Sequence, residues 1–155
     1  MIVEEWYNRK EVTGLNQALQ DKLYIEYQVE TSTLVIGWEG DVTSKEIRDG
    51  YKLVLDLVHM YKPNKWVLDL TKREFIKGKD RRWVFTNIFS KALRFLNEDI
   101  FVAIIQPVDT FQNLVSELQG DELMYNENFL IINHFLYQEA GKRWLDEMSR
   151  LNKSA

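Results

Sequence analysis

The chain has 155 residues, of which 45% are hydrophobic and 28% are charged, and its formal net charge is −4. This size and composition predict one globular domain with its own hydrophobic core, and the acidic balance argues against a general nucleic-acid-binding protein. The chain contains no cysteine, which excludes disulfide bonds, a thiol nucleophile and thiolate metal ligands.

The N-terminal stretch Met1–Trp6 contains acids where a secretory signal would carry lysines. No apolar run approaches the roughly 20 residues that are needed to cross a bilayer. We therefore expect a cytoplasmic protein with no membrane insertion. We interpret residues 1–20 as an N-terminal extension with a short helix near Leu15–Leu19, residues 21–152 as the domain, and residues 153–155 as a disordered tail.

Two alternating segments open the domain. Leu23–Val29 and Thr33–Glu39 both have the period of a strand with one buried face, and Glu30–Ser32 between them suits a hairpin turn. Gly40 is expected to end the second strand.

A capping box marks the start of the first helix. The Thr43 hydroxyl and the Glu46 carboxylate can satisfy backbone amides that a helix start leaves without partners. Pro63 ends the helix. Its apolar stripe at helical spacing consists of Ile47, Tyr51, Val54, Val58 and Tyr61.

The middle of the chain predicts a short strand over Lys65–Leu70 and a second helix from Asp80, as its cap, to about Asn97. The continuous apolar run Ile100–Ile105 is typical of a central parallel strand that is buried on both faces, and Pro107 closes it. The inner stripe expected for the second helix is Trp83, Ile88, Ala92 and Leu96.

The last third predicts a short helix over residues 111–118, a buried strand at Phe129–Ile132 and a final helix from about Leu136. Gly141 lies inside the final helix, where it costs about 1 kcal/mol relative to alanine and therefore indicates close packing. The inner stripe expected there is Ala140, Trp144, Met148 and Leu151.

The resulting order, β-β-α-β-α-β-α-β-α, predicts a single α/β domain. A hairpin followed by alternating strands and helices implies a mixed, mostly parallel sheet with about four helices and right-handed crossovers.

Several short motifs accompany this order: Trp38-Glu39-Gly40, Asp69-Leu70-Thr71, Phe75-Ile76, and Ala140 with Trp144-Leu145. With them, the chain from about Leu23 to Leu151 resembles the STAS domains of anti-sigma-factor antagonists, especially the SpoIIAA-like proteins. The resemblance implies a STAS-like fold and a non-enzymatic module that regulates signalling by binding a protein partner. A related group resembles the lipid-binding CRAL-TRIO domains, which implies the alternative of a small apolar or anionic ligand.

Regulatory members of that family carry a serine, at the turn that opens the second helix, which a kinase phosphorylates. The corresponding turn here reads Lys77-Gly78-Lys79-Asp80 and has no acceptor. The resemblance therefore implies docking and competition between partners without a serine switch.

The same turn is strongly basic. Residues 71–82 hold six cations and two acids, a net charge of +4 on an acidic protein. Because the start of a helix favours an anion, this segment is a candidate docking site for an acidic partner or a small anion; the alternative is a solvated loop. The candidate residues are Thr71, Lys72, Arg73, Lys77, Lys79, Arg81 and Arg82.

Asp69 and His134 each follow a predicted core strand, so both could reach the same edge of the sheet. A carboxylate that orients an imidazole is a common acid/base arrangement. The alternative is that each side chain satisfies nearby backbone groups. Because no nucleophile stands beside either residue in the sequence, we expect no enzyme.

The second helix carries more aromatic side chains than one packed face requires. Phe85, Phe89 and Phe95 could form a homodimer patch, line an apolar ligand cavity or belong to a well-packed helix. The two histidines, His59 and His134, lie far apart, and no metal-binding motif is present, so we expect no metal and no cofactor.

Overall fold

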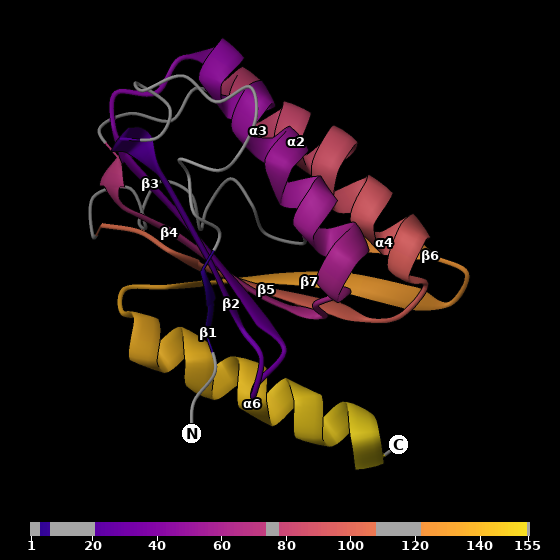
Figure 1. Ribbon diagram of the computed structural model, residues 1–155. Coiled ribbons are helices and arrows are strands. Elements are labelled where there is room, and N and C mark those ends of the chain that lie inside the picture. Colours follow the sequence, from indigo (N-terminus) through magenta and orange to yellow (C-terminus); the bar gives the residue numbers. More distant parts are fainter. Residues whose placement is uncertain (1–3, 7–20, 74–77, 108–121, 155) are drawn as a thin grey trace.

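The computed structural model describes residues 4–6, 21–73, 78–107 and 122–154, and in them a single mixed sheet lies between two layers of helices (Figure 1). The strand order is β1-β2-β3-β4-β5-β7-β6, in which β3, β4, β5 and β7 run parallel and the outer strands pair antiparallel. The prediction of an α/β fold with a mixed sheet is confirmed, and three of the six strand pairings described are parallel and three are antiparallel. The strands are β1 (Glu4–Trp6), β2 (Leu23–Gln28), β3 (Thr33–Gly40), β4 (Lys65–Arg73), β5 (Ile100–Ile105), β6 (Glu122–Tyr125) and β7 (Asn128–Phe135).

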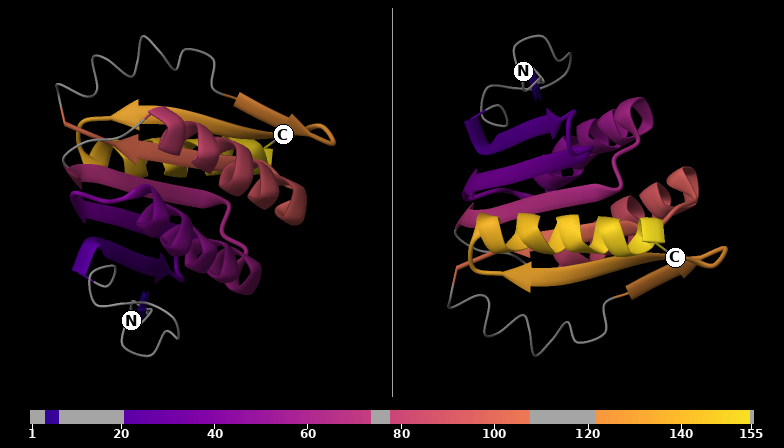
Figure 2. Two further views of the ribbon diagram at one scale, coloured as in Figure 1. Left: turned by 90° about the horizontal axis from the view of Figure 1, so that it is seen from above. Right: turned by 90° about the horizontal axis from the view of Figure 1, so that it is seen from below.

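Helices cover both faces of the sheet. One face carries α2 (Ser44–Tyr61) and a continuous helix made of α3 (Gly78–Val84), the π-helical turn η2 (Phe85–Phe89) and α4 (Ser90–Leu96). The other face carries α6 (Gln138–Ser154), which lies in front of the sheet in the right-hand view of Figure 2. The core is therefore divided into two parts by the sheet.

Because successive side chains of a strand point to opposite faces of the sheet, each strand residue belongs to one of the two parts of the core. Leu34, Trp66 and Val102 point to the larger part, under α2 and the α3–α4 helix. Val67 and Phe101 point to the smaller part, where Leu145 of α6 packs on them. Because a sheet covered on both faces buries all its side chains, β5 has no exposed residue, as its continuous apolar run predicts.

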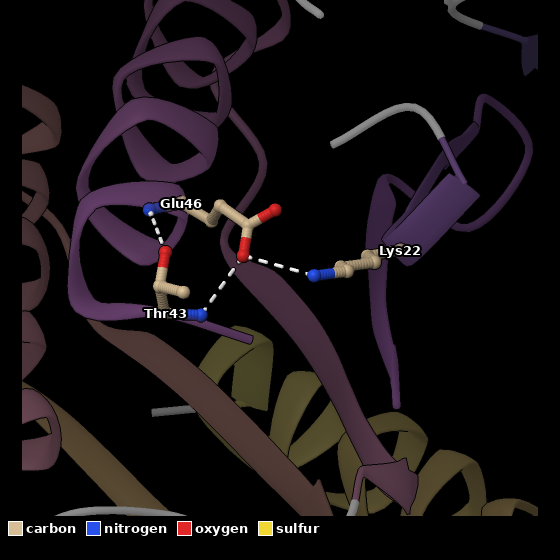
Figure 3. A network of polar contacts seen from close by, with 3 residues as sticks. All are labelled: Lys22, Thr43 and Glu46. Atoms are coloured by element: carbon tan, nitrogen blue, oxygen red, sulfur yellow. Dashed lines mark hydrogen bonds and ion pairs between the residues drawn. The ribbon is translucent and has the colours of Figure 1, made fainter. Parts of the chain in front are cut away.

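The predicted capping box is present at the start of α2 (Figure 3). The Glu46 backbone N–H donates to Thr43 Oγ1 at 3.1 Å, and the Thr43 backbone N–H donates to Glu46 Oε1 at 2.9 Å. Lys22 Nζ, from the residues just before β2, reaches the same carboxylate oxygen at 3.0 Å. Burial opposes ionisation, but the hydrogen bonds from Thr43 and Lys22 outweigh it and lower the pKa of Glu46. The helix start is thereby tied to the first hairpin.

Gly141 marks the close packing that the sequence indicates. A Cβ atom at this position would lie 2.8 Å from Ile105 Cδ1 and 3.2 Å from Ala103 Cβ. A Cβ atom here would displace Ile105 Cδ1 and would be tight against Ala103 Cβ, so glycine suits the depth at which α6 lies on β5.

Several element predictions need correction. Asp80 lies within the first turn of α3 and does not precede it, and its side chain is buried. The final helix begins at Gln138, and Leu151 on it is exposed. The strand at Phe129–Ile132 extends over Asn128–Phe135 and fully buries only Leu130, because it lies next to the edge of the sheet. Strand β6, which pairs with it, was not predicted.

Other predictions fall on parts of the chain without a description. The helix expected over residues 111–118 and the one near Leu15–Leu19 both lie outside the described residues. Within the segment interpreted as an extension, β1 pairs with β2 as an edge strand, and α6 reaches Ser154 in the segment interpreted as a tail.

Candidate functional site

A cavity of about 440 Å³ lies between α2, the α3–η2 segment and the carboxyl ends of β4, β5 and β7. Its volume is in the range of small-molecule sites, and its place is that at which open α/β sheets bind ligands. Most of its wall is apolar. The apolar side chains include Leu68, Leu70, Val84, Phe89, Ile104 and Ile132.

A register shift in β4 brings a cation to this wall. Gly37 of β3 lies opposite Asp69, but Glu39 lies opposite Lys72, so β4 contains one residue more than β3 over this stretch. The extra residue shifts by one the alternation of β4 side chains between the two faces of the sheet beyond Leu70. Arg73 therefore lines the cavity, whereas Lys72 lies on the α6 side of the sheet. Bulges commonly re-aim side chains beside functional sites.

The Arg73 side chain is only 5% exposed, and burial lowers the pKa of its guanidinium from the ordinary value. Its Nη2 lies 4.0 Å from Asp80 Oδ2, which is too long for a hydrogen bond. Among the described residues, Arg73 Nε and Nη2 and Asp80 Oδ2 have no hydrogen-bond partner. Arg81 and Arg82 line the same cavity, so its charged residues comprise three arginines and one carboxylate.

The far wall of the cavity is polar and neutral. Gln106, directly after β5, is fully buried, and its Nε2 lies 3.0 Å from His134 Nδ1 on β7. Burial and the nearby charge of Arg81 lower the pKa of His134, so its imidazole is neutral at pH 7. Tyr51 of α2 also lines the cavity, and burial raises the pKa of its hydroxyl to about 12. Apart from the arginines and Asp80, these polar groups remain uncharged.

The predicted basic segment does not form one surface. Arg73, Arg81 and Arg82 line the cavity, whereas Lys72 lines a second, smaller hollow on the α6 face. Thr71 and Lys79 are exposed to solvent. Lys77, the remaining candidate, lies outside the described residues.

Asp69 and His134 are not brought together. Asp69 points to the α6 face, where it accepts hydrogen bonds from the Thr71 hydroxyl at 2.6 Å and from Gln138 Nε2 at 2.7 Å. His134 points to the opposite face of the sheet, into the cavity. Because a β-sheet separates the two side chains, the proposed acid/base pair is wrong.

The three aromatic candidates also separate. Phe85 and Phe89 line the cavity and meet edge to face, with ring centroids 6.4 Å apart. Phe95 is 42% exposed and packs beside the ring of His59, where the C-terminal ends of α2 and α4 meet. The π-helical turn that carries Phe85 and Phe89 is the kind of local widening found often at functional sites.

Sequence reasoning did not select Gln106, Tyr51 or Asp80 as site residues. Gln106 gave one signal, since a polar residue directly after a fully apolar strand lies where ligands meet such sheets. Tyr51 and Asp80 gave none, because Tyr51 fits the apolar stripe of the first helix and Asp80 fits a helix cap.

In the part of the chain that the structure describes, no three His, Cys, Asp or Glu side chains come close enough together to hold a metal ion. None of the helices described is both long enough and apolar enough to cross a membrane. A scan against protein-family models, a search of curated proteins and a search of solved structures each return no match.

Proposed function

We propose that the protein is a non-enzymatic binding module that holds a small amphipathic anion in the cavity between the α3–η2 segment and the sheet. The observation that carries this proposal is the buried Arg73 guanidinium at the edge of an apolar cavity. A buried charge needs hydrogen bonds to offset its desolvation, and its Nε and Nη2 have none among the described residues. A carboxylate or phosphate would supply them in the geometry that a guanidinium favours.

The charge balance of the cavity supports an anion. Among the described residues, three arginines and one carboxylate line the cavity, so its wall carries a net positive charge. The apolar wall supports a ligand body without charge, because such a body gains about 25 cal/mol for each Å² of apolar surface that it buries. Together these features suit a molecule with one anionic end and an apolar body.

Titration calorimetry with decanoate tests the proposal, with decyltrimethylammonium as a probe of the same chain length and opposite charge. We expect decanoate to bind and the cation not to bind. Replacing Arg73 with glutamine should weaken decanoate binding by roughly tenfold to a hundredfold, the range for hydrogen bonds to a charged group. Lys79→Gln makes the same charge change at an exposed site of α3 and should have little effect.

The Arg73→Gln variant leaves Asp80 buried beside a neutral side chain, so its fold must be checked by circular dichroism. The double variant Arg73→Gln/Asp80→Asn removes both charges and should bind decanoate as poorly as the single variant. Equal affinity of the wild type for decanoate and decyltrimethylammonium would contradict the proposal.

A second candidate function is docking of a protein partner or of a second copy of the chain, within a STAS-like fold. The β6–β7 hairpin supports it, because Met124 is 69% exposed and Tyr125 and Phe129 are partly exposed at the edge of the sheet. Exposed apolar side chains at an open edge are typical of interfaces. Sedimentation velocity should then show a dimer that Met124→Lys weakens. A wild-type chain that stays monomeric at high concentration would leave only a different partner for this surface.

A further inference from the structure

The Gln106–His134 pair on the cavity wall carries an inference about the ligand that goes beyond its charge. Gln106 is held on the main-chain side by a hydrogen bond from its backbone N–H to the Phe135 carbonyl at 3.1 Å. Its side chain is held by the 3.0 Å contact between its Nε2 and His134 Nδ1. Gln106 Oε1 and His134 Nε2 are both buried and have no hydrogen-bond partner among the described residues.

The hydrogen-bonding character of this pair does not depend on how the Gln106 amide is oriented. If Nε2 donates to His134 Nδ1, the imidazole carries its proton on Nε2, and the pair offers the Gln106 carbonyl as acceptor and the His134 N–H as donor. If the amide is turned over, the carbonyl accepts from Nδ1–H, and the pair offers the amide as donor and His134 Nε2 as acceptor. A neutral His134 therefore leaves one donor and one acceptor in either case.

The imidazole is neutral under ordinary conditions. Burial and the nearby Arg81 both lower the pKa of His134. Among the described residues, the charged groups that line the same cavity are three arginines and Asp80, so the positive charge that opposes protonation is in excess.

We infer that the anion bound in this cavity also carries a hydroxyl group on its apolar body, which the Gln106–His134 pair recognises. A hydroxyl both donates and accepts, so it can satisfy the two unpartnered atoms at once. The ligand class is an apolar molecule with one hydroxyl and one anionic group, for which a hydroxycarboxylic acid is the simplest probe. This inference rests on the proposed function, because the anionic end is assigned to Arg73.

The distance between the two recognition points sets the spacing of the two groups. Arg73 continues from β4 and His134 lies on β7, and β5 runs between these strands. The strand register puts His134 level with Leu68, five residues before Arg73 on β4, so the two residues are offset along the strands as well as by the roughly 10 Å that separates β4 from β7. The hydroxyl is therefore several carbon atoms away from the carboxylate and not next to it.

Calorimetry with a series of monohydroxydecanoates, in which the hydroxyl moves from carbon 2 to carbon 10, tests the inference. We expect at least one mid-chain or distal isomer to bind the wild type roughly tenfold more tightly than decanoate, because its hydroxyl forms two neutral hydrogen bonds inside the cavity. The 2-hydroxy isomer should gain nothing. The methyl ether of the best isomer can accept but not donate, so it should lose most of the gain.

The Gln106→Met variant has a side chain of similar length without hydrogen-bonding groups. In it, the affinity ratio of the best hydroxydecanoate to decanoate should fall to about one, whereas Lys79→Gln should keep the wild-type ratio. If Gln106→Met does not fold, the methyl ether series with the wild type decides the question.

The outcomes separate the two proposals. If decanoate binds in preference to decyltrimethylammonium but no hydroxydecanoate binds more tightly than decanoate, the hydroxyl inference is wrong and the proposed function stands. If decanoate itself shows no preference over the cation, the proposed function fails and the inference fails with it.

Discussion

Each polar side chain near the carboxyl ends of the strands owes its role to the face of the sheet on which it lies. Asp69 accepts hydrogen bonds from the Thr71 backbone and hydroxyl and from Gln138, so it ties the end of β4 to the start of α6. His134 likewise lies in the C-terminal half of its strand, β7, but points into the cavity. Two residues in equivalent sequence positions thus have a structural role and a proposed binding role.

The pH dependence of stability should report the burial of His134. Its folded pKa lies below the ordinary value of 6.5, so below pH 6.5 the unfolded chain takes up a proton before the folded chain does. Stability is therefore lost as pH falls from 6.5 toward the folded pKa. Urea unfolding at pH 7.5 and pH 5.5 should show a larger loss for the wild type than for His134→Gln. Equal losses in both proteins would contradict this account.

Gly141 should resist substitution even though it lies in a helix. Alanine would gain about 1 kcal/mol of helix propensity. Against this gain, a Cβ atom 2.8 Å from Ile105 Cδ1 overpacks the interface, which typically costs about 1–3 kcal/mol. We expect Gly141→Ala to lower the free energy of unfolding by about 1 kcal/mol, measured by urea denaturation. Adding Ile105→Val removes the offending Cδ1 atom and should restore part of the loss; a stabilised single variant would disprove the close contact.

At the scale of elements, two local irregularities explain why the sequence pattern assigned some side chains to the wrong face: the extra residue in β4 and the π-helical turn η2. Counting by twos from Leu68 and Leu70 places Lys72 on the cavity face, but the extra residue in β4 gives that face to Arg73. The π-helical turn likewise changes the inner stripe of the second helix. The stripe observed is Val84, Ile88, Phe89, Ala92 and Leu93.

Helix α6 allows a matched test of packing. Leu145 is 1% exposed and packs against β4 and β5, whereas Leu151, six residues later on the same helix, is 65% exposed. Leu145→Ala should lower the free energy of unfolding by about 2–5 kcal/mol, because it removes transfer energy and leaves a cavity. Leu151→Ala should change it by less than about 0.5 kcal/mol. Similar denaturation midpoints for the two variants would show that α6 does not pack as described.

At the scale of the whole molecule, the cavity joins elements that are distant in sequence, namely α2, β4, the α3–η2 segment and the ends of β5 and β7. A ligand that bridges them would stabilise the entire fold, because it binds only when all are in place. Binding should therefore be visible in global unfolding and not only in local signals.

Thermal unfolding measures this linkage. Decanoate at about 100 times its dissociation constant should stabilise the folded state by about 2.7 kcal/mol. For a domain of this size, that corresponds to a rise in the melting temperature of about 5–10 °C. Arg73→Gln should remove most of the rise, and decyltrimethylammonium should produce none. A melting temperature that does not change with saturating decanoate would contradict the cavity as its binding site.

Local patterning was enough for most of the elements between Leu23 and Leu151. The capping box, the hairpin turn, the proline stops and the apolar run of β5 act through near neighbours in the chain, so their signals are written in short segments. The short β6 carries no comparable signal, because four residues at an edge have their conformation set by the strand beside them.

The site depended on long-range geometry. Which of the basic residues enter the cavity, and that Asp69 and His134 lie on opposite faces, follow from strand register and from one extra residue in β4. Side chains alternate between faces with a period of two, so a shift of one residue moves a side chain through the whole thickness of the sheet. The sequence therefore predicts a basic segment at the end of a strand. Only the strand register and the packing of the sheet against its helices decide that Arg73 of this segment lines the cavity.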